Sequence, residues 1–221
     1  MHSAGLTTGF VAWDNRRKPI AMHITEAQRE NRARFVGGFY GQLVSSLLWL
    51  VSAGLATWGS PRTAITALVV GGFFIFPLTE LLIRVSGKSR SLSAANSLSS
   101  LGMQAAFVLP LSMPLLLPVG LYRLNWFYPA MTILLGAHYC PFVFLYGMRM
   151  FAVLAAVLVG GGVVIAMYLS SSFSVAAWYT GILLLVFAGV GRAIVQRELR
   201  DGTAGTGSGM GDALGGGSVS E

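Results

Sequence analysis

The fold of this chain is decided by residues 126–170, WFYPAMTILLGAHYCPFVFLYGMRMFAVLAAVLVGGGVVIAMYLS. The only Asp, Glu, Lys or Arg in this stretch is Arg149, which divides it into apolar runs at 126–148 and 150–170. A transmembrane α-helix needs about 20 mostly apolar residues, and each run is long enough. Backbone polar groups in hydrocarbon must be satisfied within a helix or a closed barrel, and the alternating pattern of barrel strands does not occur here. Both runs are therefore predicted to be transmembrane helices.

Four more runs of this kind lie along the chain: 36–58, 62–84, 98–118 and 174–194. The sequence therefore predicts an all-α membrane protein, a bundle of six transmembrane helices that occupies residues 36–196. The composition agrees, because 54% of the residues are hydrophobic and only 10% are charged. An ordinary soluble domain has about 25% charged residues, so a fully water-facing surface is excluded.

The basic residues predict which way the bundle faces. Thirteen of the 15 Lys and Arg residues fall at or beyond the ends of runs on one side of the bundle, and the other two are Arg62 and Arg123. Cytoplasmic connections carry an excess of Lys and Arg, so both termini are predicted to be cytoplasmic. The net charge of +7 then indicates contact with anionic lipid headgroups at the cytoplasmic face, and nucleic acid is not expected as a partner.

The segments before and after the bundle are predicted to be cytoplasmic as well. Residues 1–24 lack the apolar core of a signal peptide and are expected to form a disordered arm. Residues 25–35 are expected to form a short, basic amphipathic helix, in which Thr25 and Gln28 have the spacing of a capping box. Residues 197–221 are rich in Gly and Ser, which predicts a flexible tail.

Two ionisable residues, Glu80 and His138, lie inside the runs, where polar side chains are costly and for that reason usually functional. With Arg84 and Arg149 taken as level with the interface, the helical rise places Glu80 about 6 Å and His138 about 16 Å deep. Two glutamines enter from the same side at about 9 Å each: Gln42 and Gln104. These side chains together predict a polar path from the cytoplasm toward the middle of the membrane.

Each ionisable residue also has a structural explanation, which the sequence leaves open. Glu80 lies one helical turn before Arg84, so the two side chains could form an interfacial ion pair. His138 could be a neutral packing element that is hydrogen-bonded to a carbonyl or a glutamine. Because histidine titrates near neutral pH, His138 could instead be part of a proton-linked switch or bind a substrate.

Prolines are expected to break helices beside both ionisable positions. Pro77 precedes Glu80 by three residues and Pro141 follows His138 by three, and each removes a hydrogen bond to the carbonyl four residues earlier. Transporters often build their sites from discontinuous helices of this kind. The run 98–118 has three more prolines at a spacing of four, which predicts a kinked helix: Pro110, Pro114 and Pro118.

Small residues predict where helices touch. Gly37, Gly41 and Ser45 repeat at four-residue spacing, which is typical of close packing between membrane helices. Packing within the bundle is the first interpretation. A homo-oligomer formed through this face is the alternative.

The sequence also argues against several functions. His2, His23, His138 and Cys140 do not have the spacing of metal ligands, so no metal or other cofactor is expected. A second carboxylate inside the runs, which acid–base catalysis of the aspartyl type would need, does not occur, and the chain is not expected to be an enzyme. An intramembrane hydrolase with a serine near His138 is retained as a third alternative.

Four segments resemble an uncharacterised bacterial family of multi-span integral membrane proteins: NRARFVGGFYGQLVSSLLWLVSA, GGFFIFPLTELL, GMQAAFVLPLS and RLNWFYPAMTILLGAHYCPFVFLYGMRMF. The resemblance covers roughly residues 26–170. It implies a bacterial inner membrane and transfers no activity and no functional residue.

Two functions are compared on this basis. The first is a small-solute, ion or proton-linked transporter or channel with a polar path from the cytoplasmic side. The second is a non-catalytic membrane scaffold or assembly subunit. A water-accessible cavity that reaches His138 from the cytoplasmic side would favour transport, and a dry, packed bundle would favour the scaffold.

Overall fold

The computed structural model describes residues 22–87, 91–169 and 171–212, and within them every regular element is helical. Five helices are long and apolar enough to cross a membrane, and a sixth span results if one bent pair counts as a single span. These lengths and compositions are those of a multi-span membrane protein. The predicted disordered arm lies outside the described residues, apart from its last three residues.

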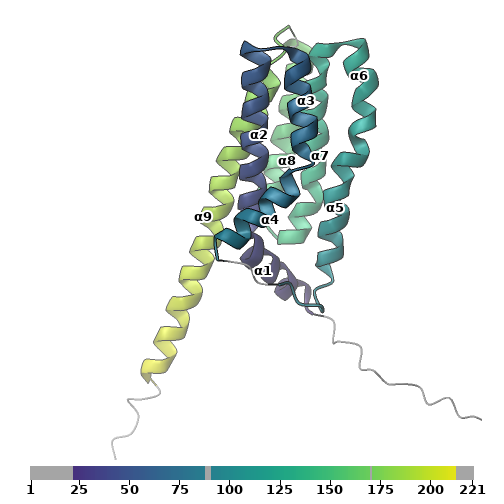
Figure 1. Ribbon diagram of the computed structural model, residues 1–221. Helices are drawn as coiled ribbons and strands as arrows, with labels where there is room; N and C mark the ends of the chain where they lie inside the picture. Colours follow the sequence, from purple (N-terminus) through teal and green to yellow (C-terminus); the bar gives the residue numbers. More distant parts are fainter. Residues whose placement is uncertain (1–21, 88–90, 170, 213–221) are drawn as a thin grey trace, which may run out of the picture.

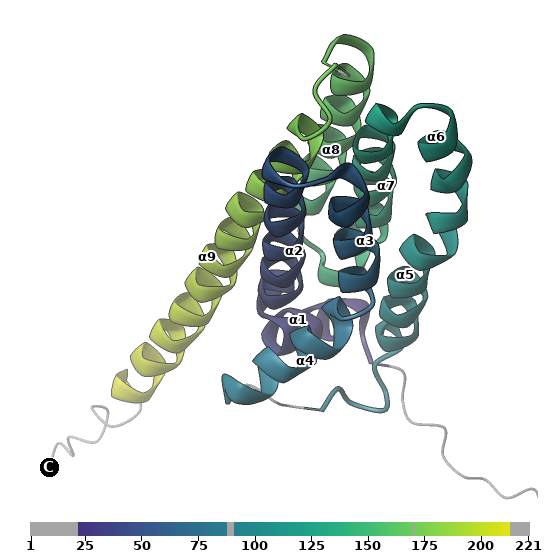
Figure 2. The same ribbon diagram turned by 45° about the horizontal axis from the view of Figure 1, so that its top comes forward.

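The spans run side by side in a bundle, and a short helix lies across one end of it (Figures 1 and 2). That short helix is α1, Ile24–Phe35. The spans are α2, Phe39–Trp58; α3, Pro61–Gly72, with α4, Ile75–Val85; α5, Leu98–Ser112, with η2, Met113–Leu115, and α6, Leu116–Tyr122; α7, Phe127–Tyr146, preceded by η3, Leu124–Trp126; α8, Met150–Tyr168; and α9, Val175–Asp212. The described chain enters and leaves the bundle at the end where α1 lies (Figure 1). Whether this end is cytoplasmic stays a prediction.

The second span is broken. The axes of α3 and α4 meet at 56°, and the break falls at Phe73 and Phe74. The N–H groups of these residues bond back to Val70 and Gly71, and Pro77 has no N–H to donate to the Phe73 carbonyl. Because α3 has only 12 residues, or about 18 Å of rise, it is shorter than the hydrocarbon core of about 30 Å.

The prolines of the other spans differ in their effect on the helices that contain them. α5 contains Pro110 and α7 contains Pro141, and both helices continue through these positions. The predicted break at Pro141 therefore does not occur, whereas α5 ends at Ser112, two residues after Pro110. Pro114 lies in the 3₁₀ turn η2, which separates α5 from α6. This kinked span reaches Tyr122, four residues beyond its predicted end.

The core is formed mainly where α7 packs on α8 and α2 packs on α9. Gly136 makes the first contact possible, because a Cβ there would lie 3.0 Å from the Ala155 carbonyl oxygen. In contrast, only 11% of the apolar window of the α5–α6 span is buried, against 33% to 44% for the other long spans. The bundle therefore has a densely packed side and a loosely attached span.

A left-handed turn separates α1 from α2. Val36, Gly37 and Gly38 all have positive φ, at 51°, 61° and 82°. Gly37 is thus part of a turn and not of the first span, although it packs closely on Val195 of α9. Gly41 lies in α2 and faces Thr79 of α4 at ordinary van der Waals distance.

Both ends of the described chain differ from the predicted boundaries. α1 begins at Ile24 with His23 as its N-cap and without a side-chain cap, so Thr25 and Gln28 do not form a capping box. The reason is that the Gln28 amide bonds to another helix. α9 continues past residue 196 to Asp212, through a part of the predicted tail that contains no proline.

Candidate functional site

The base of the bundle is built around α1, which caps the end of α7. Gln28 Nε2 donates to the Phe144 carbonyl at 2.7 Å, and Asn31 Nδ2 donates to the next carbonyl, that of Leu145, at 3.3 Å. Arg32 donates to the carbonyl after that, Tyr146, at 2.5 Å. The last carbonyls of a helix have no partner within the helix, and here three consecutive ones are satisfied by one neighbouring helix.

The same short helix also binds two other parts of the chain. Arg32 forms an ion pair with Glu198 of α9, with 3.1 Å between nitrogen and oxygen. The Glu30 carboxylate accepts hydrogen bonds from the Ser93 N–H at 2.7 Å and from Asn96 Nδ2 at 2.6 Å. Ser93 and Asn96 lie in the segment that leads into α5. α1 therefore holds the starting point of the loosely attached span.

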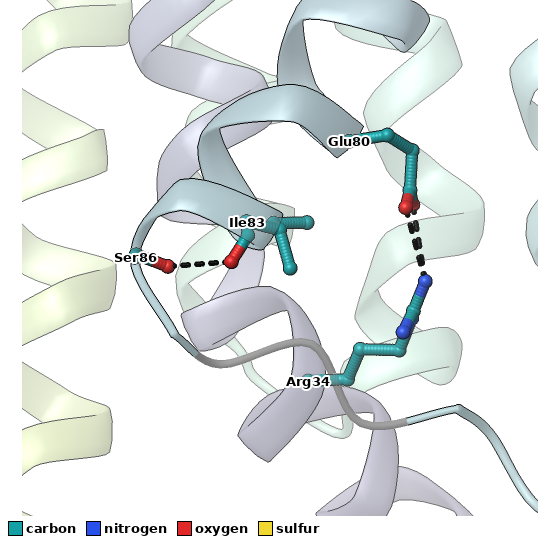
Figure 3. Close-up of polar contacts among 4 residues, drawn as sticks. All are labelled: Arg34, Glu80, Ile83 and Ser86. Carbon is teal, nitrogen blue, oxygen red and sulfur yellow. Dashed lines mark hydrogen bonds and ion pairs between the residues drawn. The ribbon is translucent and has the colours of Figure 1, made fainter.

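Glu80 is paired with α1 and not with its own helix. Arg34 of α1 reaches the Glu80 carboxylate at 3.1 Å, and the two side chains are only 16% and 19% exposed (Figure 3). Arg84, the predicted partner, lies exposed in the last turn of α4. The sequence favoured Arg84 because it is one turn away, whereas Arg34 is brought close only by the fold. The charge of Glu80 is thus compensated at the base.

The predicted polar path is not assembled. Gln104 lies exposed on α5 and does not join Gln42, which is 2% exposed within the bundle. His138 is half-buried on α7, with its ring against Tyr139 and Phe142 at centroid distances of 5.8 and 5.1 Å. It faces the backbone of α5 at Ala105, and its Nδ1 atom is buried without a hydrogen bond.

Besides His138 Nδ1, two more polar groups inside the bundle are buried without a hydrogen-bond partner among the described residues. Gln42 lies beside the Tyr139 hydroxyl, but neither atom of its amide makes a hydrogen bond of good geometry. Thr79 of α4 has a buried hydroxyl that is also unpaired. Sequence reasoning missed Thr79, because a threonine in an apolar run carries no signal until its burial is known.

Two shallow, open hollows in the surface lie away from the base. One, of about 500 Å³, is on α3, and the other, of about 460 Å³, is at the connection between α6 and α7. Figure 1 shows that this connection lies at the end of the bundle opposite α1. Neither is lined by any residue of the predicted path. Among the residues that the structure describes, His, Cys, Asp and Glu do not gather in groups of three that could hold a metal ion.

A family model, "Family of unknown function (DUF7010)", matches residues 24–192. The chain belongs to this family. The matched region begins with α1 and contains the whole segment 26–170 for which the sequence suggested an uncharacterised family. No curated protein and no solved structure matches the chain.

Proposed function

We propose that the chain is a non-catalytic membrane scaffold or assembly subunit. The observation that carries this proposal is the base, where α1 is bonded to α4, α7, α9 and the segment before α5. A carrier of the alternating-access type opens each end by moving one group of helices against another. Because one short helix is bonded to four elements, the α1 end of the bundle is expected to stay fixed while a partner binds.

A reversible cross-link across the base tests this proposal. In a Cys140→Ser background, Arg32→Cys and Glu198→Cys place two thiols at the contact between α1 and α9, and a short bifunctional thiosulfonate joins them. The readout is complementation of a strain that lacks the gene. Linked protein is expected to complement as well as reduced protein. Loss of complementation on linking, with recovery in dithiothreitol, would contradict a static base, and Arg32→Cys alone controls for the substitution.

Small-solute transport is the second candidate, and the unpaired groups in the interior favour it. Gln42 and Thr79 have polar atoms buried without a partner, and Thr79 lies just after the broken part of the second span. Transport sites are often built from polar groups that lie beside a discontinuous helix. If the protein is a transporter, the Gln42 side chain would face a water-filled path.

Thiol accessibility separates the two candidates. Gln42→Cys in the Cys140→Ser background is treated in membranes with a small charged thiosulfonate. The scaffold proposal expects no reaction, as for Leu154→Cys, a reference position that is fully buried among apolar residues. Rapid reaction of Gln42→Cys with an unreactive Leu154→Cys would instead favour a transport path.

We also propose that the protein lies in a bacterial inner membrane with both termini in the cytoplasm. The exposed arginines at the α1 end support this orientation and contact with anionic headgroups there, since Arg84 lies in the last turn of α4 and Arg149 precedes α8. Reporter fusions at each terminus test the orientation. A homo-oligomer remains a prediction, which the mass of the purified protein in detergent tests.

A further inference from the structure

The span formed by α5 and α6 stands at the edge of the bundle, and most of its surface is uncovered (Figures 1 and 2). Its contacts with the bundle lie on one side of α5, where Ala105 is 2% exposed and Gly102 lies against Leu145 of α7. Membrane helices associate through close packing and through hydrogen bonds between helices. The opposite side of α5 is therefore free to contact a partner within the membrane.

A polar amide lies on this uncovered side. Gln104 is exposed, and its side chain makes no hydrogen bond to any other residue that the structure describes. It lies about 9 Å of helical rise beyond Leu98, the first residue of α5, and so inside the span. Hydrocarbon offers an amide no hydrogen bond, and polar side chains in spans are usually paired with a neighbouring helix. Because an amide both donates and accepts, a second Gln104 is a matching partner for this side chain.

Gln104 belongs to a stripe that has the spacing of a coiled coil. Ser100, Gln104, Phe107 and Leu111 follow one another at steps of four, three and four residues, and all four are exposed. The two apolar members, Phe107 and Leu111, are 57% and 75% exposed. A repeat of this kind packs on a like repeat of another helix, and a single polar residue within it fixes the register and the number of helices. These four residues, the Gln104 face, extend over about 17 Å of α5.

We propose that two copies of the chain pair in the membrane through the Gln104 face, with the two Gln104 amides hydrogen-bonded to each other. A twofold interface brings the same surface of each copy together, which suits a side chain that is complementary to itself. The glycines at four-residue spacing do not form this contact, because Gly37 packs on Val195 and Gly41 faces Thr79 of the same chain. The pairing is expected whether the protein is a scaffold or a transporter.

Single cysteines along α5 test which side of the helix meets the second copy. In the Cys140→Ser background, Ser100→Cys and Phe107→Cys are oxidised in native membranes, and the products are separated by mass. Both variants are expected to form disulfide-linked dimers. Ser99→Cys and Ala106→Cys are the matched controls, because each is exposed and next to a tested position but lies about 100° away around the helix. The controls are expected to stay monomeric.

Substitution of Gln104 tests the amide. Gln104→Leu keeps the approximate size of the side chain and removes its hydrogen bonds, so the dissociation constant of the dimer is expected to rise about tenfold. Energy transfer between full-length copies that carry different fluorescent proteins, reconstituted in lipid vesicles, measures this constant. Gln196→Leu is the matched control, because Gln196 is an exposed amide on α9, and its dimer is expected to dissociate like that of the natural protein.

Four results would overturn the proposal. Equal cross-linking of the tested and control positions would mean that the copies meet only by random collision. Neither cross-links nor energy transfer would mean that a second copy does not cover this face. A cross-linked product of a different mass would assign the face to another protein. An unchanged dissociation constant in Gln104→Leu would show that the amides do not lie at the contact.

Discussion

The base of the bundle and the region around Gln42 and Thr79 both contain buried polar side chains, but those of the base make more hydrogen bonds. At the base, the amides of Gln28 and Asn31 donate to the end of α7. Further inside, the amide of Gln42 and the hydroxyl of Thr79 are buried and unpaired. Buried polar groups that are satisfied hold a structure together, whereas unsatisfied ones cost free energy and call for an explanation. The difference suggests a structural task for the base and leaves the interior as the place to test for a solute or water.

The largest loss of stability is expected on substitution of Arg32, because this side chain bonds to both α7 and α9. Arg32→Ala removes the bond to the Tyr146 carbonyl and the ion pair with Glu198. The loss of charge-assisted hydrogen bonds from a side chain that is 13% exposed should lower the free energy of unfolding by about 2–3 kcal/mol. Unfolding in detergent or in nanodiscs measures it.

Arg29→Ala is the matched control for Arg32→Ala, since Arg29 lies on the same helix and is exposed. Its free energy of unfolding should stay within about 0.5 kcal/mol of the natural value. If both variants lose the same stability, the effect is one of helix propensity or net charge, and the base is not held by the contacts of Arg32.

Substitution of Gln42 is expected to raise the free energy of unfolding, whereas substitution of Arg32 lowers it. Gln42→Leu keeps the volume and removes an unpaired buried amide, so the protein should become about 1 kcal/mol more stable. Asn31→Leu, at an amide of the base whose Nδ2 donates to the Leu145 carbonyl, should destabilise the protein. A loss of stability in Gln42→Leu, measured in the same unfolding assay, would mean that the amide has a partner, either the neighbouring Tyr139 hydroxyl or an ordered water.

The sequence predicted the spans because hydropathy and length are local properties. Runs such as 126–148 and 150–170 became α7 and α8 within a few residues. The contacts of the site depend on which helices meet, and local spacing cannot show this. Spacing thus paired Glu80 with Arg84, and it placed Gln104 inside, although the buried face of α5 is marked by Ala105.

The smallest contribution to the free energy of unfolding is expected from the ion pair between α1 and α4. Glu80→Gln and Arg34→Gln each remove one partner, and a double-mutant cycle isolates their mutual interaction from the other contacts of Arg34. Because the pair is partly exposed, its coupling should be about 0.5–1 kcal/mol. Unfolding of the two single variants and the double variant gives this value.

Arg84→Gln combined with Glu80→Gln is the matched control, since Arg84 lies one turn away on the same helix. Its coupling to Glu80 should be close to zero, because the carboxylate is directed toward α1 (Figure 3). If Arg84 shows the larger coupling, α4 is not tied to α1 and is free to move against the base. The base would then lose one of its four attachments. The contrast with the unpaired Gln42 and Thr79 would weaken, since Thr79 lies next to Glu80 on that helix.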